Sequence, residues 1–480
     1  MTMSLLPRLS LVLAAVTLAG CTVGPDYRRP AAPVPAAYKE LDGWKVAQPR
    51  TAASNAPWWS VYGDPVLDQL EQQVEVNNEN LKAAEAAFRQ ASAVVAQTRA
   101  GLFPAVTLDA NAQRARSTSG GTTTIPRIRN SFDTSAGISS WELDLWGRIR
   151  RAVESDVAAA QASAADLASA RLSNQGQLAS VYFQLRVADE VKRVLDATVE
   201  AFQRSLDITQ NRYNVGVAAR ADVASAQAQL ENTRSQAVGV GVQRAQLEHA
   251  LAALVGKAPA DFTLPPASLT ADVPVAPTGL PSELLERRPD VASAERLMAS
   301  ANADIGAAEA AYFPTITLSA SFGFTSSAVD TLFRAARRTW ALGAGASEPL
   351  FDGGLRGARV AEAEAVYDQR VAQYRQAVLT AFQQVEDNLA ALRVLEQQAD
   401  VQAGALRAAQ EAEALTLNQY RAGTVAYTNV ITAQATALQS RQTALSILQS
   451  RLVASVALIQ ALGGGWDVRQ LPPASTLGAR

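Results

Sequence analysis

The chain has 480 residues, of which 18% are charged, and its formal net charge is −2 at pH 7. This balance provides no basic surface for nucleic acid, and no run of Lys and Arg alternates with aromatic residues. The single cysteine excludes an intramolecular disulfide. The single histidine, His249, argues against a His/Cys metal site, and its neighbours place it on a polar helix face.

Residues 1–20 are expected to be a signal peptide. Arg8 makes the start weakly basic, and the apolar stretch that follows has about ten residues, whereas a bilayer span needs about 20. The segment Leu18-Ala19-Gly20-Cys21 resembles the lipobox of bacterial lipoproteins, in which the cysteine becomes the acylated N-terminus. Several acyl chains would anchor the protein stably. Thr22 stands where an Asp would retain such a lipoprotein in the inner membrane, so the resemblance implies the outer membrane. The alternative is an ordinary signal peptide with a cysteine by chance.

Residues 21–65 should form a lipid-anchored, extended segment, because they are rich in Pro and Ala and show no period. A helix is then expected to start at Asp64-Pro65, an N-cap residue followed by a first-turn proline, and to end near Gly101. It opens a repeat that spans residues 66–256.

The period changes to two after this helix. Residues 104–146 alternate apolar and polar side chains, which predicts a β-hairpin. Trp141 and Trp146, near its end, suit a membrane–water interface, and ordinary core packing is the alternative.

A proline-free run over residues 148–214 predicts one helix about 100 Å long, at roughly 1.5 Å per residue. Apolar residues three and four positions apart give it a coiled-coil seam. A glycine turn and a return helix, 219–256, should complete the repeat, and the proline-rich residues 257–282 read as a linker.

The same order recurs in residues 283–462. A helix opens at Arg288-Pro289-Asp290, a second alternating hairpin covers 314–350, a long helix covers 355–421, and a return helix covers 426–462. Residues 463–480 are expected to be a polar tail. The fold class is therefore mixed α and β, with two internal repeats.

Strands joined to very long helices suggest a channel. No run after the signal peptide reads as apolar enough for a membrane helix, whereas each of the four strands is long enough to cross a bilayer. An open sheet cannot lie in lipid, because its edges would leave backbone groups unpaired. Two chains would supply eight strands, and side chains would fill the interior of a barrel of that size. Three chains would supply twelve strands and leave a lumen. The alternative is a soluble protein with both hairpins packed on helices.

The motifs and their order resemble the bacterial outer-membrane efflux proteins, the TolC-like family, in its NodT-type lipoprotein branch. The residues that carry the resemblance are Cys21, Phe103-Pro104, Trp141 to Arg148, Arg287 to Asp290, Phe313-Pro314, Pro349 to Gly354, and the Tyr-x-x-Gly turns at Tyr213 and Tyr420. The resemblance implies a homotrimer whose twelve-stranded barrel continues into a helical periplasmic tunnel. It further implies the exit duct of a tripartite efflux pump, with a periplasmic adaptor and an inner-membrane transporter of the resistance-nodulation-division type.

In this family the tunnel narrows at the turns farthest from the barrel. The resemblance places a periplasmic gate at Tyr213, Arg220, Asp222, Tyr420, Arg421, Thr428 and Thr432. Val425, Thr428 and Thr432 are uncharged where better-known members carry carboxylates, so a gate closed by packing and hydrogen bonds is expected. Alternatively, Thr428 and Thr432 are ordinary helix-pairing residues.

Two other functions remain open from sequence: a duct for metal efflux or protein secretion, and a lipid-anchored periplasmic scaffold. An enzyme is not expected, because no nucleophile–base grouping or phosphate-binding glycine loop is present. No cofactor is expected other than the covalent lipid on Cys21.

Overall fold

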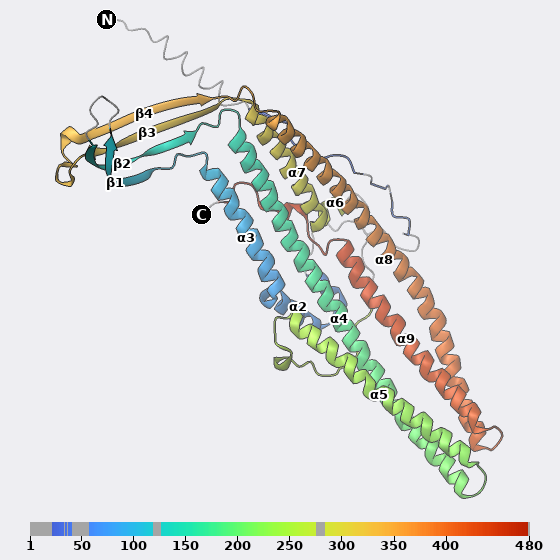
Figure 1. Cartoon of the computed structure of the whole chain (residues 1–480). Coiled ribbons are helices and arrows are strands. Elements are labelled where there is room, and N and C mark those ends of the chain that lie inside the picture. The colour runs from blue at the N-terminus through green and yellow to red at the C-terminus, as the bar shows by residue number, and fades with distance from the viewer. Residues whose placement is uncertain are drawn as a thin grey trace.

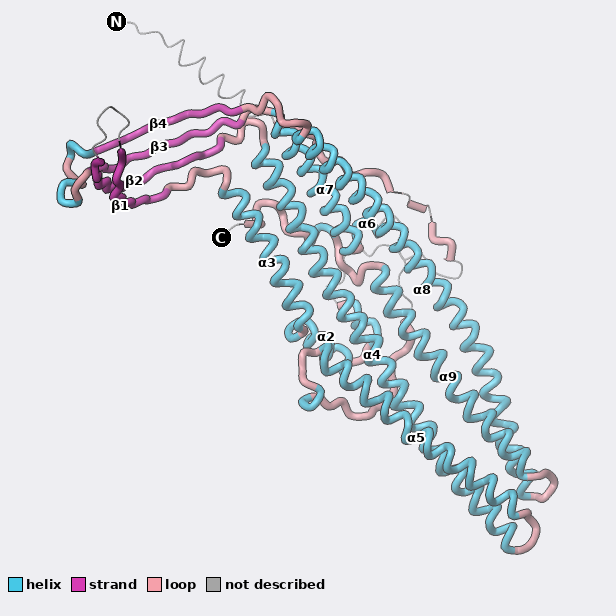
Figure 2. Tube along the Cα trace, in the orientation of Figure 1, coloured by secondary structure: helices cyan, strands magenta, loops and turns pink. Residues whose placement is uncertain are grey.

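The computed structural model describes residues 22–32, 34–35, 37–40, 57–118, 126–274 and 284–478. A four-stranded sheet lies at one end and long helices extend away from it (Figures 1 and 2). The strands are β1 (Thr107–Thr118), β2 (Pro126–Glu142), β3 (Thr315–Ser326) and β4 (Arg338–Ser347). The helices are α2 (Pro65–Asn77), α3 (Glu79–Ala100), α4 (Arg148–Asn214), α5 (Arg220–Leu254), α6 (Leu284–Arg287), α7 (Pro289–Glu309), α8 (Leu355–Arg421) and α9 (Tyr427–Ala461), with short 3₁₀ turns between them.

The two long helices, α4 and α8, have 67 residues each and cover the proline-free runs of the sequence. Each starts after a glycine with positive φ, Gly147 at 83° and Gly354 at 92°. An aspartate just upstream accepts hydrogen bonds from first-turn backbone N–H groups: Asp144 from Ile149, and Asp352 from Arg356. The glycine permits the sharp turn out of the sheet, and the carboxylate satisfies donors that a helix start leaves free.

The prediction of a single helix from Asp64 to about Gly101 is wrong, because the chain breaks at Asn78 into two helices, α2 and α3. The Asn78 side chain accepts hydrogen bonds from Asn80 N and Leu81 N, and its amide group donates to Leu254 O at 2.8 Å. Asn78 therefore caps the start of α3 and also joins it to the end of α5. Apolar spacing alone misses such a break, because it continues through the cap.

A second junction of this kind joins α9 to α7. Arg288 donates to Ala461 O at 3.0 Å, near the end of α9, and is neutralised by Asp290. Gly463 follows α9 with φ 93° and lies directly against the backbone of Arg287. The short helices α3 and α7 thus continue the lines of α5 and α9 beside the long helices α4 and α8 (Figure 1).

The core lies where these helices meet at mid-length. One cluster gathers around Tyr182 and Phe183 of α4, together with η1 (Trp58–Tyr62), α2 and α9. A second lies between α7, α8 and α9, around Met298 and Val378.

Contrary to the expectation that no later run is apolar enough for a membrane helix, α9 is long and apolar enough to cross a bilayer. Its apolar side chains have another explanation, because Leu452, Val456 and Leu458 are fully buried in the two core clusters.

The four strands form one antiparallel sheet in the order β1-β2-β3-β4, so the two predicted hairpins join through β2 and β3. The register shifts between Ile138 and Trp141, where a bulge interrupts the pairing of β2 with β3. β1 and β4 are the edges of the sheet in this chain, and side chains on both are exposed.

Both ends of the described chain pack on the helices. The described residues between 22 and 40 follow α7 and then α8: Tyr27 donates to Glu295 at 2.5 Å, and Glu40 pairs with Arg393. The expected polar tail also contains a buried residue, Leu477, which packs near Val95 of α3. The signal peptide, Cys21, most of the first hairpin loop and residues 275–283 lie outside the described residues.

Candidate functional site

Two helical hairpins form the end of the molecule farthest from the sheet (Figure 1). Each long helix turns into its return helix through a glycine with positive φ, Gly216 at 78° and Gly423 at 80°. In both turns a backbone N–H reaches back to the last turn of the long helix, from Val217 to Arg212 O and from Thr424 to Gln419 O. These Schellman-type ends fix where the return helices start.

Arg212 of α4 joins the two hairpins. Its guanidinium donates to the backbone carbonyls of Tyr420 and Arg421 at 3.0 and 3.1 Å and lies 4.8 Å from the centre of the Tyr420 ring. The carbonyls at the end of α8 carry the negative end of the helix dipole, so a cation there is favourable. We call this contact the Arg212 clamp.

A buried polar cluster lies next to the clamp. Tyr427 donates to or accepts from Ser205 at 3.2 Å, and the Tyr420 hydroxyl donates to Thr209 at 3.4 Å. The two tyrosine rings are 5.1 Å apart. Burial raises the pKa of Tyr427, so its hydroxyl stays protonated at physiological pH and can donate a hydrogen bond. The cluster and the clamp together hold the α8–α9 hairpin on α4.

The gate residues of the first hairpin lie outside this cluster. Tyr213 is 38% exposed, and the Arg220 guanidinium lies 5.9 Å from the centre of its ring. Asp222 accepts a hydrogen bond from Ala219 N at 3.2 Å, which caps the start of α5. Although Tyr213 and Tyr420 occupy corresponding places in the sequence, only Tyr420 is buried, at 3% exposure.

The gate residues of the second hairpin bond within their own elements. Thr432 donates to Thr428 O one turn earlier, and both side chains are exposed in the single chain. Arg421 donates to the Asn418 side chain at 3.4 Å. Of the seven predicted residues, the structure brings only Tyr420 into the buried cluster.

Sequence reasoning missed Ser205, Thr209, Arg212 and Tyr427. A signal was present, since Ser205, Thr209 and Arg212 follow one another at spacings of four and three on one face of α4. An apolar seam along α4 does not include these polar positions.

At the other end, the sheet has two faces of opposite character. Strand pairing places the even-numbered residues of β1, β3 and β4 on one side, which we call the apolar face. Several of its large side chains are exposed in the chain: Leu108 is 80% exposed and Trp340 is 73% exposed. The opposite, polar face carries mostly small or polar side chains: Asp109, Asn111, Gln113, Ser131, Asp133, Ser135, Ser319, Ser321, Gly343 and Gly345.

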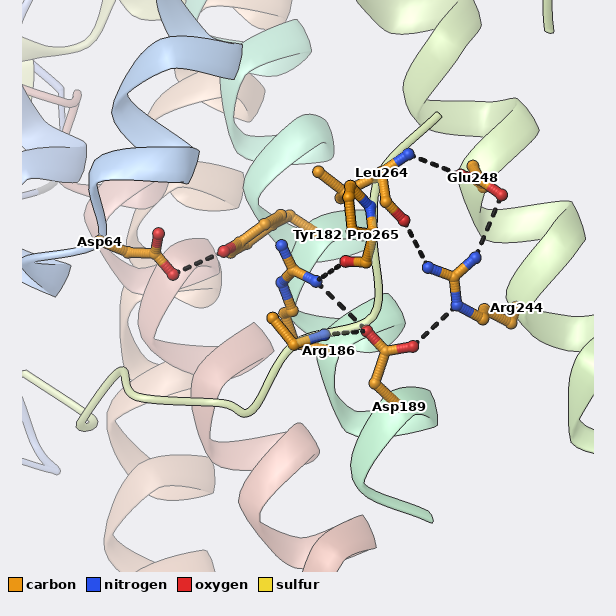
Figure 3. A network of polar contacts seen from close by, with 9 residues as sticks. Asp64, Tyr182, Arg186, Asp189, Arg244, Glu248, Leu264 and Pro265 are labelled. Atoms are coloured by element: carbon orange, nitrogen blue, oxygen red, sulfur yellow. Dashed lines mark hydrogen bonds and ion pairs between the residues drawn. The ribbon is translucent and has the colours of Figure 1, made fainter. Parts of the chain in front are cut away.

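A polar network at mid-length holds the segment after α5 on the long helix (Figure 3). Asp189 of α4 accepts from Arg244 at 2.8 Å and from Arg186 at 3.2 Å. Arg244 also pairs with Glu248, and Leu264 N donates to Glu248 at 2.7 Å. Because every charge in the network has a partner, we read it as a structural clamp.

The described part of the chain contains no group of three or more His, Cys, Asp or Glu side chains arranged to hold a metal ion. His249 is exposed on α5. The lipidation site expected at Cys21 lies outside the described residues, and Val23, two positions later, donates to Trp146 O at 3.0 Å beside the start of α4.

Comparison with known proteins agrees with this architecture. The family model of the outer membrane efflux proteins matches residues 70–257 and 280–464. TtgC of Pseudomonas putida, described as a probable efflux pump outer membrane protein, is 33% identical over 462 residues, 95% of each chain. OpmQ of Pseudomonas aeruginosa, described as a pyoverdine export outer membrane protein, is 33% identical over 96% of this chain and 97% of its own. The solved outer-membrane channel OprN superposes with a TM-score of 0.87 at 31% identity, over 93% of this chain and all of that one. The chain therefore belongs to the outer membrane efflux protein family and is an efflux channel protein of the outer membrane.

Proposed function

We propose that three copies of the chain close one twelve-stranded barrel that continues into a helical tunnel, and that each chain carries a duplicated strand-and-helix unit. The observation that carries this proposal is the order of elements. The strands run β1-β2-β3-β4, and α3, α4, α7 and α8 contact one another in that same sequence. The sheet and the helical layer thus have their free edges at corresponding elements, β1 with α3 and β4 with α8.

Closure with neighbouring copies would satisfy both layers together. In lipid, the unpaired backbone groups of β1 and β4 must find partners, and a neighbouring copy supplies them without any other protein. The apolar face would contact lipid and the polar face would line the lumen. Twelve strands leave an open interior, whereas eight would be filled by side chains.

The proposed role is the exit duct of a tripartite pump, which conducts small toxic compounds passively from a periplasmic adaptor and an inner-membrane transporter of the resistance-nodulation-division type. Relatives are named for toluene, solvent and antibiotic efflux, which supports small organic cargo. Pyoverdine export, for which OpmQ is named, makes a secreted siderophore the second candidate cargo. Cys21 would carry the lipid, and the hydrogen bond from Val23 to Trp146 would hold the anchor beside the base of the sheet.

The hairpin ends would form the periplasmic gate, held closed by the Arg212 clamp and the tyrosine cluster rather than by a ring of carboxylates. Two hydrogen bonds from a charged donor and one cation–π contact are together worth on the order of a few kcal/mol per chain at a half-buried site. Because the clamp joins α4 to the α8–α9 hairpin, its loss would favour outward movement of that hairpin. Tyr213, Arg220, Asp222, Arg421, Thr428 and Thr432 would then line the aperture around it.

Complementation of a deletion strain tests the duct. The wild-type gene should restore resistance to the exported compounds. A Ser327→Cys variant, in the connection between β3 and β4, should react with a membrane-impermeant maleimide–biotin on intact cells. Labelling only after the outer membrane is permeabilised would instead support a periplasmic scaffold.

Leakage tests the gate. Arg212→Ala should make cells several-fold more sensitive to vancomycin, which intact outer membranes exclude, and Arg212→Lys should do so less. Arg204→Ala is the matched control, because Arg204 is exposed on the same helix. Its guanidinium lies 3.9 Å from the carboxylate of Glu200, on its own helix. Equal sensitivity of Arg212→Ala and the control would refute the clamp. If Asp222→Arg and Thr428→Ala also leave permeability unchanged, those two residues are not part of the gate.

A further inference from the structure

Besides Arg127 and Arg129 of β2, five arginines gather at the end of the sheet farthest from the helices. Arg114 and Arg116 lie on β1, and Arg334, Arg337 and Arg338 lie in or just after the connection between β3 and β4. Their side chains are exposed, and none of the five forms an ion pair with a carboxylate among the described residues. Within the described part of the chain, one hydrogen bond is made by these guanidinium groups, from Arg338 to Ala335 O at 3.2 Å.

Three of these arginines lie on the apolar face. The pairing places Arg114 and Arg116 on the side that carries Leu108, and it places Arg338 on the side that carries Trp340. An arginine that faces lipid is costly at the middle of a membrane and nearly neutral at its surface. Arg116 is separated from the first residue of β1 by about the length of strand that crosses a bilayer, roughly 9–11 residues, so it belongs at the far surface.

The stagger of the sheet fixes how neighbouring copies must meet. Thr107 pairs with Gly137, Gly137 with Ser321, and Ser321 with Ala341. Thr107 is the first residue of β1, but Ala341 stands six residues before the last residue of β4, Ser347. Six residues of offset thus accumulate over the three pairings between β1 and β4. Each step from one strand to the next therefore shifts the strand ends by about two residues, as a tilted barrel requires.

One further step of the same size places Ala341 opposite Ala115 of the neighbouring copy. A slip by a single residue would turn the apolar face of the neighbour inward, so only even shifts are allowed. The resulting register pairs all of β4 with β1 of the neighbour and places Trp340 opposite Arg116 and Leu342 opposite Arg114. Residues directly opposite one another on antiparallel strands have Cβ atoms about 4.5–5.5 Å apart, and diagonal neighbours lie within reach of long side chains.

We propose that each seam between copies is a binding site for the phosphate groups of an anionic lipid in the outer leaflet. Arg114 and Arg116 come from one copy, and Arg338 and Trp340 come from the next, so each site is assembled only where the edges of two copies meet. The guanidinium groups bind the phosphate oxygens, as arginine does with bidentate geometry. Trp340 and Leu342 lie beside the acyl chains. The ligand is a phosphorylated glycolipid of the lipid A type, because the site faces lipid at the outer surface. This inference rests on the trimeric barrel proposed above.

Disulfide trapping tests the seam by itself. Cys21 is the only native cysteine and is acylated in the proposed mature protein, so introduced thiols report alone. The double variant Ala112→Cys with Ala344→Cys should give covalent dimers and trimers on oxidation. Leu108→Cys with Ala344→Cys, displaced by four residues, should not. Absence of cross-links in both double variants would overturn the trimeric seam and with it the proposed barrel.

Native mass spectrometry of the detergent-purified trimer tests the lipid. Added hexa-acylated lipid A should bind at up to three copies per trimer, and its dephosphorylated form should not. Arg116→Gln and Arg338→Gln should each weaken binding roughly tenfold, the order expected for one lost charge-assisted hydrogen bond. Arg129→Gln is the matched control, because Arg129 is paired with Ala115 at the same end of the sheet and lies on the polar face.

Retention of lipid A by all three variants alike, or equal binding of the dephosphorylated form, would overturn the lipid site while the cross-links leave the barrel intact. Displacement of lipid A by inorganic phosphate at low millimolar concentration would show a site for free phosphate, which also contradicts the assignment to lipid.

Discussion

Glu71 allows a quantitative prediction from a buried ionisable group. It lies on α2 with 0% exposure, and neither carboxylate oxygen has a hydrogen-bond partner among the described residues. Burial, with smaller contributions from Glu75 and Asp68, raises the pKa of Glu71 from 4.5 to about 9. The folded protein therefore keeps this side chain protonated at neutral pH.

The sign of the pH dependence follows from that shift. Between pH 4.5 and 9 the Glu71 side chain releases a proton in the unfolded chain but retains it in the folded chain, so the contribution of Glu71 to stability is greatest below pH 4.5 and falls as the pH rises toward 9. Each pH unit in this range costs about 1.4 kcal/mol, so the cost is roughly 3 kcal/mol at pH 7 and above 5 kcal/mol at pH 8.5. Glu71→Gln keeps the shape of the side chain and removes its ionisation.

The assay is thermal unfolding of the detergent-purified protein, followed by helical circular dichroism at pH 5, 7 and 8.5. The Tm of Glu71→Gln should exceed that of wild type at pH 8.5, by less at pH 7, and hardly at all at pH 5. Glu85→Gln, at an exposed position of α3, is the control and should show no such trend. A gain that is the same at all three pH values, or a loss at pH 8.5, would refute the buried, unpartnered carboxyl.

Three further changes test the joints of the helical layer. Asn78→Ala should lower stability by about 1–3 kcal/mol, because it removes the cap of α3 and leaves Leu254 O without that donor, whereas Asn80→Ala should have little effect in the same thermal melt. Gly463→Ala should prevent folding or lower Tm strongly, since its Cβ would lie 2.0 Å from Arg287 O, whereas Gly465→Ala meets no atom within 4 Å and should cost only about 1 kcal/mol of backbone strain. Arg244→Ala should free the segment after α5 and speed its cleavage in limited proteolysis, because Asp189 and Leu264 O lose a donor; unchanged cleavage would contradict the clamp in Figure 3.

Local patterns were sufficient for the long elements. The proline-free run of small and apolar residues predicts the length of α4. The glycine turns that precede and follow the run set the two ends of the helix. The alternation in the strands predicted two faces, and pairing in the sheet confirms which residues share each face. These properties depend on neighbours within a few positions, which the sequence shows directly.

The break at Asn78 and the Arg212 clamp could not be found in this way. The capping role of Asn78 depends on the end of α5, which lies 176 residues away in sequence. Arg212 meets carbonyls 208 and 209 residues away, and only the packing of α8 and α9 against α4 brings them within reach.

The sequence by itself determined the order of the strands and the long helices, the lengths of α4 and α8, and the faces of the sheet, since backbone periodicity and turn chemistry are local. Only the tertiary structure decided which helix ends are joined, which tyrosine is buried at the tip, and how far the strands slip past one another. Those features depend on contacts between residues far apart in the chain, and such contacts are set by packing geometry.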